Sequence, residues 1–176
     1  AERAAIALQE LRALENPSVG LRALAVAAEA AYLYEHFTGH ADAALDEGFR
    51  AAERYRACGD ADSMRRIQAN LVDTLLQAGR NEEAVALGTS LVAALRGTRD
   101  LGPLVYAQLN LAAGLLALRR AAEAGATLAE AWPRAYLYGI EDECAAHVAL
   151  WSVQEARFEV ALRVAGFSEA TYTQSG

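Results

Sequence analysis

The sequence repeats one helix–turn–helix pattern at a nearly constant spacing of about 40 residues. The pattern is clearest at 70–84, where an apolar-spaced stretch meets Gly79 and the acidic pair Glu82 and Glu83 begins the next stretch. Each returning stretch carries an alanine near its start, and these alanines are almost evenly spaced: Ala44, Ala84, Ala124 and Ala161. A repeat of this length with a helix break at its centre predicts stacked helix pairs, each covering the apolar face of the next.

The composition favours an all-α fold. Of the 176 residues, 54% are hydrophobic but only 7% are aromatic, and there are three prolines and no long β-branched run. Ala, Leu, Glu and Arg are strong helix formers, whereas strands are rich in β-branched and aromatic residues. We predict a single all-α domain over residues 1–176, and helical pattern at both ends suggests a piece of a larger protein.

Breaks in the apolar pattern set the expected helix limits. Gly39 and Gly79 end helices, Pro103 lies in a first turn, and Pro133 predicts a kink near 129–133. Ser18, Asn81 and Asp142 are the expected N-caps. The almost wholly apolar stretch 19–38 is expected to be buried on more than one side. The expected helices are 2–15, 19–38, 40–56, 62–78, 81–96, 103–118, 121–137, 142–155 and 158–171.

Charge and residue usage argue against several classes of function. A net charge of -7 gives this chain no basic face for nucleic acid. All 16 basic residues are arginine, so neither a P-loop lysine nor a Schiff-base lysine is available. No apolar run of about 18 residues could span a membrane. Cys58 and Cys144 are interpreted as small apolar residues in a reducing, cytoplasmic compartment rather than as a disulfide.

The histidines give little support to a metal or catalytic site. His36 and His40 are four residues apart with Asp42 nearby, a spacing that binds zinc when both imidazoles share one helix face. Gly39 is expected to end the helix between them, so a polar turn is the better interpretation. His147 stands at the position of Asn70 in its own repeat, where a helix-packing contact is expected. We therefore predict no metal, no cofactor and no enzyme activity.

Residues 70–84 resemble the inner part of a tetratricopeptide repeat: Asn-Leu, a Leu, then Gly, then Glu-Ala. The resemblance implies a right-handed α-α superhelix of about four helix pairs, here preceded by an N-terminal helix. The spacing of about 40 residues exceeds the family's usual 34. The segment Glu155–Gly166 is similar to a C-terminal piece of large bacterial signal-transduction ATPases of the maltose-regulator group. In those proteins a tetratricopeptide region acts as a sensor beside an ATPase core and a DNA-binding domain.

The same resemblance implies a binding groove lined by the first helix of each pair. The positions that match the family's groove-facing pattern are Arg66, Ala69, Asp73, Leu76, Gln77, Tyr106, Leu109, Ala113 and Leu116. Polar and aromatic side chains at such positions suit recognition of an extended peptide. A solvated face without a ligand is an equally compatible interpretation of the same residues.

These observations lead to three hypotheses about function. The first is a non-enzymatic regulatory domain of a bacterial transcriptional regulator that binds a protein, a peptide or a small-molecule inducer in the groove. The second is a structural assembly module that forms a homodimer through an open end of the helix array. The third is a sensor domain for a peptide pheromone.

Overall fold

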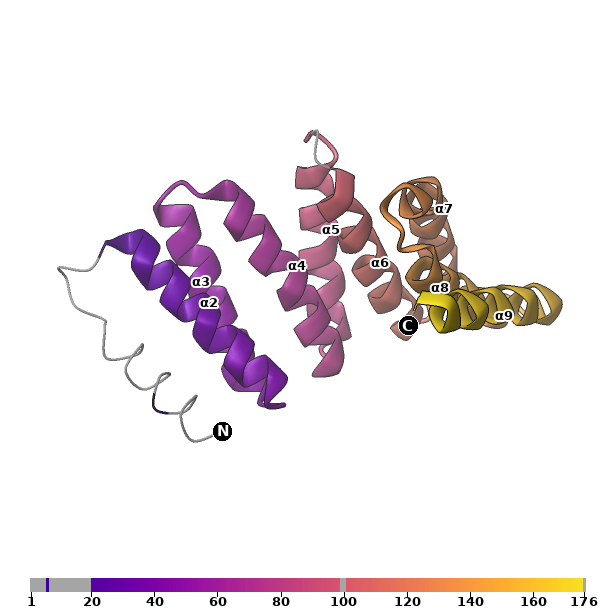
Figure 1. Ribbon diagram of the computed structural model, residues 1–176, viewed down its shortest axis with the longest axis horizontal. Helices are drawn as coiled ribbons and strands as arrows, with labels where there is room; N and C mark the ends of the chain where they lie inside the picture. The colour runs from indigo at the N-terminus through magenta and orange to yellow at the C-terminus, as the bar shows by residue number, and fades with distance from the viewer. Residues whose placement is uncertain (1–5, 7–19, 99–100, 176) are drawn as a thin grey trace. The chain divides into compact units, whose positions relative to one another are not determined.

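The computed structural model describes residue 6, residues 20–98 and residues 101–175 (Figure 1). Within these ranges it contains eight α-helices and no strand, which confirms the all-α prediction. The expected helix at 2–15, apart from Ile6, and the expected cap Ser18 lie outside the described residues. The helices are α2 (Leu21–Phe37), α3 (Ala41–Ala57), α4 (Ala61–Gln77), α5 (Asn81–Leu95), α6 (Leu101–Ala117), α7 (Ala121–Tyr138), α8 (Glu141–Gln154) and α9 (Phe158–Ser175).

The helices begin at a regular interval. From α2 to α8 the first residues are evenly spaced: Leu21, Ala41, Ala61, Asn81, Leu101, Ala121 and Glu141. The repeat seen in the sequence is therefore a pair of helices. Two expected N-caps are wrong by one position or more. Asn81 is the first residue of α5, and Asp142 lies inside the first turn of α8, whose N-cap is Ile140. The turns before α5 and α8 end at residues 80 and 140, so each helix has already begun at the residue expected to cap it or before it.

The helices group into two compact units, Ala1–Arg80 and Asn81–Gly176. In unit 1, α3 packs against both α2 and α4. In unit 2, α6 packs against α5 and α7, and α8 packs against α6, α7 and α9. Buried residues of α6, α7 and α8 form one core cluster of unit 2: Val105, Leu109, Ala112, Leu128, Ala131, Ala135, Ile140 and Cys144.

One turn geometry ends most of these helices. After α4, the Gly79 N–H donates to the Leu76 carbonyl at 3.0 Å and the Arg80 N–H donates to the Leu75 carbonyl at 2.9 Å. This is the Schellman pair of hydrogen bonds, which needs a residue with positive φ just after the helix. The same pair of bonds and a positive φ occur at six helix ends, where the residue is Gly39, Gly59, Gly79, Arg119, Gly139 or Ala156.

Arg119 and Ala156 are the two places where a side chain is forced into this conformation, at φ 58° and 56°. A left-handed conformation costs a residue with a Cβ roughly 1 kcal/mol more than glycine. We expect Arg119→Gly and Ala156→Gly each to raise the free energy of unfolding by about 0.5–1 kcal/mol, measured by urea denaturation. The matched control is Ala122→Gly in the first turn of α7, which should lower stability by a similar amount. A less stable Arg119→Gly variant would contradict this account of the turn.

Glycines inside the helices allow close contact with large apolar side chains. A Cβ on Gly48 of α3 would lie 2.6 Å from Leu71 of α4, and one on Gly88 of α5 would lie 3.3 Å from Leu111 of α6. The contact between Gly48 and Leu71 thus recurs one repeat later, between Gly88 and Leu111. In the following repeat the apolar residue is the larger Trp151, which lies on Gly125 instead. The Trp151 indole N–H also donates to the Ala121 carbonyl at 2.9 Å. A large side chain seated on a glycine is a repeated packing device of this chain.

This packing predicts a graded response to alanine. A Cβ at position 125 would lie 2.7 Å from the Trp151 indole nitrogen, whose hydrogen bond holds the ring in place. Gly125→Ala should therefore destabilise the protein by about 1–3 kcal/mol through overpacking. Gly88→Ala meets only a 3.3 Å contact and gains helix propensity, so its effect should be smaller. Thermal unfolding of the two variants decides the order, and equal effects would show that the Trp151 contact is not tight.

Candidate binding surface of unit 1

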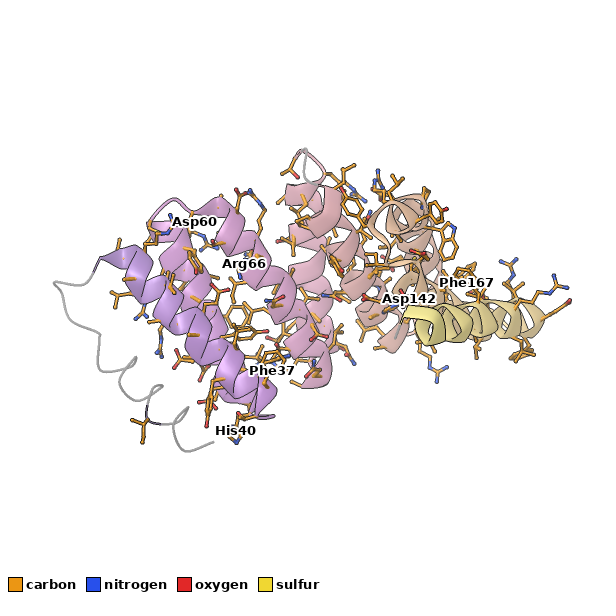
Figure 2. The ribbon with its side chains drawn as sticks, in the orientation of Figure 1. Phe37, His40, Asp60, Arg66, Asp142 and Phe167 are labelled. Carbon is orange, nitrogen blue, oxygen red and sulfur yellow. The ribbon has the colours of Figure 1, made fainter. Side chains whose placement is uncertain are left out.

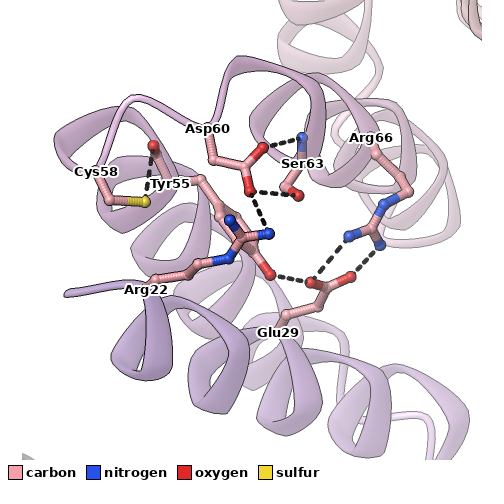
Figure 3. Close-up of polar contacts among 7 residues, drawn as sticks. All are labelled: Arg22, Glu29, Tyr55, Cys58, Asp60, Ser63 and Arg66. Carbon is pink, nitrogen blue, oxygen red and sulfur yellow. Dashed lines mark hydrogen bonds and ion pairs between the residues drawn. The ribbon is translucent and has the colours of Figure 1, made fainter. Parts of the chain in front are cut away.

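A buried carboxylate links the three helices of unit 1 (Figure 3). Glu29 of α2 is only 8% exposed. Its carboxylate accepts a hydrogen bond from the Tyr55 hydroxyl of α3 at 2.5 Å and two from the Arg66 guanidinium of α4, one of them at 3.2 Å. Burying a carboxylate is unfavourable unless it is paired and hydrogen-bonded. These bonds therefore fix how α2, α3 and α4 lie against one another.

The electrostatics of this cluster follow from burial and hydrogen bonding. Burial alone would raise the pKa of Glu29, but the hydrogen bonds from Arg66 and Tyr55 outweigh it and the net shift is downward. Burial and the hydrogen bond to the Glu29 carboxylate raise the pKa of Tyr55 to about 12. The hydrogen bond to Glu29 raises the pKa of Arg66. At neutral pH the cluster is a carboxylate, a guanidinium and a neutral phenol, so none of the three groups is set up for proton transfer.

Asp60 fixes the start of α4 beside this cluster. Its carboxylate accepts from the Ser63 backbone N–H at 3.1 Å and lies 3.0 Å from the Ser63 hydroxyl, so Asp60 is the N-cap of α4. Arg22 at the start of α2 lies 3.3 Å from the same carboxylate (Figure 3). The backbone bond, the Ser63 hydroxyl and nearby arginines together lower the pKa of Asp60. A cap accounts for this carboxylate without any catalytic role.

A second polar cluster joins α2 to α4 two turns further along. The Thr74 hydroxyl, in a residue only 1% exposed, donates to the Asn70 carbonyl of its own helix at 3.1 Å. With that proton used, it accepts from the Tyr32 hydroxyl at 3.0 Å, and His36 Nδ1 lies 3.1 Å away. The His36 ring stacks on Tyr32, with 5.6 Å between ring centroids. The contact between α2 and α4 is therefore held by polar bonds at two levels.

Beside these clusters, α2 exposes a row of apolar side chains. Val26, Leu33 and Phe37 are 52%, 38% and 82% exposed, and their spacing of seven and four residues places them on one face. Figure 2 labels Phe37 at the C-terminal end of α2 and Arg66 on α4. The prediction that 19–38 is buried on more than one side does not extend to this face. The residues of α2 that face its neighbours are mostly small, so the larger apolar side chains remain outside.

The corresponding positions of α4 carry polar side chains. Arg66, Asp73 and Gln77 lie one full repeat after Val26, Leu33 and Phe37. The Gln77 amide donates to the Asp73 carboxylate at 2.7 Å, and His36 Nε2 lies 4.0 Å from the same carboxylate. We call the two rows together the α2/α4 surface: Val26, Leu33, Phe37, Arg66, Asp73 and Gln77. The α2 half was missed from the sequence, although the repeat spacing leads to it directly from the α4 half.

The predicted groove residues fall into both units. Five of them lie in unit 1. Arg66 and Gln77 are exposed, and the other three, Ala69, Asp73 and Leu76, are partly exposed. In unit 2, Tyr106 is 42% exposed and Ala113 partly so, whereas Leu109 is 1% exposed and Leu116 is 1% exposed. Leu109 belongs to the core cluster of unit 2, because its side chain points toward α7 and α8 rather than outward.

Tyr106 has acidic neighbours in unit 2. Partial burial raises the pKa of its phenol, and the negative charges of Glu143 and Asp142 in the first turn of α8 raise it further. The exposed part of unit 2 around Tyr106 is therefore acidic. Among the described residues of α6, no row of exposed apolar side chains resembles that of α2.

The residues considered for metal binding and nucleophilic chemistry have structural roles. His40 is the N-cap residue of α3, and its Nδ1 donates to the Glu35 carboxylate at 2.8 Å. His147 Nδ1 bonds the Glu143 carbonyl of its own helix at 2.7 Å, so the expected contact between helices is wrong. Among the described residues no group of three or more His, Cys, Asp or Glu could hold a metal ion. Both cysteines are free, and burial raises the pKa of Cys144 to about 11. A thiol of this kind is a poor nucleophile.

Comparison with known proteins identifies the fold. No protein-family model and no curated protein sequence matches the chain. Two crystal structures of a kinesin light chain-like protein from Podosopora anserina, built of nearly identical TPR-like repeats, are similar to it at 14% identity. Their TM-scores are 0.81 and 0.77, over 99% of this chain and 88% and 87% of theirs. The chain therefore has the TPR-like helical repeat fold predicted from residues 70–84. None of the helices described here is long and apolar enough to cross a membrane.

Glu29 should make stability depend on pH. Its pKa is lowered in the folded protein from an ordinary value of 4.5, so its contribution is complete above about pH 4.5 and is lost as the pH falls through the lower folded value. We expect Glu29→Gln to lower the free energy of unfolding by about 1–2 kcal/mol at pH 7. On acidification the variant should lose less stability than the parent. Urea denaturation at pH 7 and at acid pH measures both quantities. Glu53→Gln, at an exposed residue of α3 in the same unit, is the control.

Proposed function

We propose that this chain is a non-enzymatic binding module that holds a segment of a protein or peptide on the α2/α4 surface. The observation that carries the proposal is the row of exposed apolar side chains on α2, of which Phe37 is 82% exposed. An exposed apolar row beside a polar row is typical of a site that takes an amphipathic segment. The TPR-like fold is compatible with this role, but the proposal rests on the surface itself.

The length of the apolar row limits the size of the segment. Val26 and Phe37 lie three turns apart on one helix, a distance of about 16 Å at the usual helical rise. A strand of about five residues covers that length. The partner would therefore place two or three apolar side chains on Val26, Leu33 and Phe37 over a short extended stretch.

The α4 half supplies polar contacts that are already ordered. Arg66 keeps 56% of its side chain exposed although Glu29 holds its guanidinium, so its outer N–H groups can donate to a carbonyl or carboxylate of the partner. Gln77 donates to Asp73 and presents its amide oxygen as an acceptor. Because these side chains are fixed before binding, less conformational entropy is lost on association.

We further propose that the module is the sensor region of a bacterial transcriptional regulator. The support is the similarity of Glu155–Gly166 to the C-terminal piece of signal-transduction ATPases of the maltose-regulator group. Binding on the α2/α4 surface would shift the packing of the module against the rest of that protein. The full coding sequence tests this step, because the parent protein must then contain a P-loop and a helix-turn-helix; a parent with neither would refute it.

The binding proposal predicts a specific pattern of lost affinity. Peptides selected from a random phage-displayed library on the folded chain are titrated calorimetrically against Phe37→Ser and Arg66→Ala. Removing the Phe37 ring should weaken binding by roughly 10- to 100-fold, since a buried Phe contributes about 1.5–3 kcal/mol. Arg66→Ala should weaken it less.

Phe49→Ser is the matched control for that experiment. Phe49 lies on α3 of the same unit and is 40% exposed, but it lies outside the α2/α4 surface. Its variant should bind as the parent does. Selected peptides that bind Phe37→Ser as tightly as the parent would place the binding site elsewhere. Loss of affinity in Tyr106→Ala alone would instead favour the part of the predicted groove that lies in unit 2.

A further inference from the structure

Helix α9 carries an exposed row of three residues that no helix described in unit 2 covers. Phe158, Leu162 and Gly166 are four residues apart, so they follow one ridge of the helix. Phe158 is 61% exposed and Leu162 is 76% exposed, and Gly166 is exposed as well. Phe158 and Leu162 expose large apolar surfaces, and burying these surfaces would be favourable.

Gly166 differs from three glycines that lie inside other helices. Gly48, Gly88 and Gly125 each lie against a large apolar side chain of the following helix. A Cβ on Gly166 would meet no atom within 4 Å. Glycine inside a helix lowers stability relative to alanine, and within the described chain nothing offsets that loss. At those three positions the glycine receives a bulky side chain, whereas no described side chain lies on Gly166.

We propose that α9 pairs with α9 of a second copy of this chain, antiparallel and across a twofold axis at Leu162. Phe158 and Gly166 lie four residues to either side of Leu162, so this axis brings Phe158 of each copy opposite Gly166 of the other. The contact repeats the arrangement of Leu71 on Gly48 and of Trp151 on Gly125. The row is complementary to itself, which is the requirement for a closed dimer with an isologous interface.

The charges that flank the row fit the same arrangement. Glu159 and Arg163 lie on one side of the row and form an ion pair of 2.7 Å, with both side chains about four-fifths exposed. In an antiparallel pair the same side of both helices comes together. Glu159 of one copy then lies at the level of residue 165 of the other, within reach of Arg163 there. Each copy thus offers an acidic and a basic group to the opposite group of its partner.

The occupant is a second copy because the features that match are all on α9. This proposal does not depend on the α2/α4 surface, which lies in unit 1. If that surface stays free in the dimer, binding there is unchanged by the variants below. It assigns the homodimer expected from the sequence to one helix and one axis.

Sedimentation velocity of the 176-residue chain, from low micromolar to millimolar concentration, tests the pairing. The parent should show a monomer–dimer equilibrium. Leu162→Glu, which puts two carboxylates at the axis, should raise the dissociation constant roughly tenfold or more. The control Leu137→Glu changes a residue that is 74% exposed on α7 and should leave the constant unchanged. A monomer at every concentration, or a dimer insensitive to Leu162→Glu, would overturn the proposal.

Two further variants distinguish this geometry from any other self-association. Arg163→Glu should weaken the dimer, and the double variant Glu159→Arg, Arg163→Glu should restore it. Leu162→Cys in a Cys58→Ser background should form a disulfide-linked dimer on mild oxidation, because only a twofold axis at Leu162 brings the two thiols together. Failure of both the restoration and the cross-link would exclude the antiparallel α9 pair even if the chain dimerises.

Discussion

The closing turn of each helix is the constraint on which the rest of this structure depends. A residue with positive φ after the last turn lets two N–H groups bond the last free carbonyls and sends the chain back along the helix just completed. Because these turns recur at an even interval from Gly39 to Gly79, and again at Arg119 and Gly139, the helices between them have nearly equal length. Equal lengths place equivalent residues at equivalent heights, which is why the contact of Leu71 on Gly48 can be repeated one helix pair later.

Polar bonds then decide which face of a helix stays outside. In unit 1, Glu29 and the Thr74 hydroxyl connect α2 to α4, and a buried carboxylate tolerates no arrangement that leaves it without its donors. With these bonds made, the row that begins at Val26 and ends at Phe37 is turned away from the core. The exposed apolar surface is therefore a consequence of how α2 is anchored, and it is the reason that we assign binding to unit 1.

The fold could be predicted because its signals are local. Glycines at the helix ends, the apolar period of a helix and the recurrence of one helix pair along the chain are all visible in the sequence, and each has one structural meaning. The candidate site could be predicted only in part. Arg66, Asp73 and Gln77 were found through their match to a repeat pattern, but Leu109 matches the same pattern and lies in the core. The pattern gives the position of a residue in its repeat, and the packing of each helix against its neighbours decides whether that position faces out.

The sequence by itself determined that the chain is all-α, where its helices turn, and that its repeat contains two helices, because these depend on the conformational preferences of neighbouring residues. Only the tertiary structure decided that Val26, Leu33 and Phe37 remain exposed, that Glu29 is buried and bonded to Arg66 and Tyr55, and that no described side chain packs on Gly166. Those outcomes depend on which surfaces of different helices meet. The sequence does not distinguish an apolar residue that another helix covers from one that stays exposed.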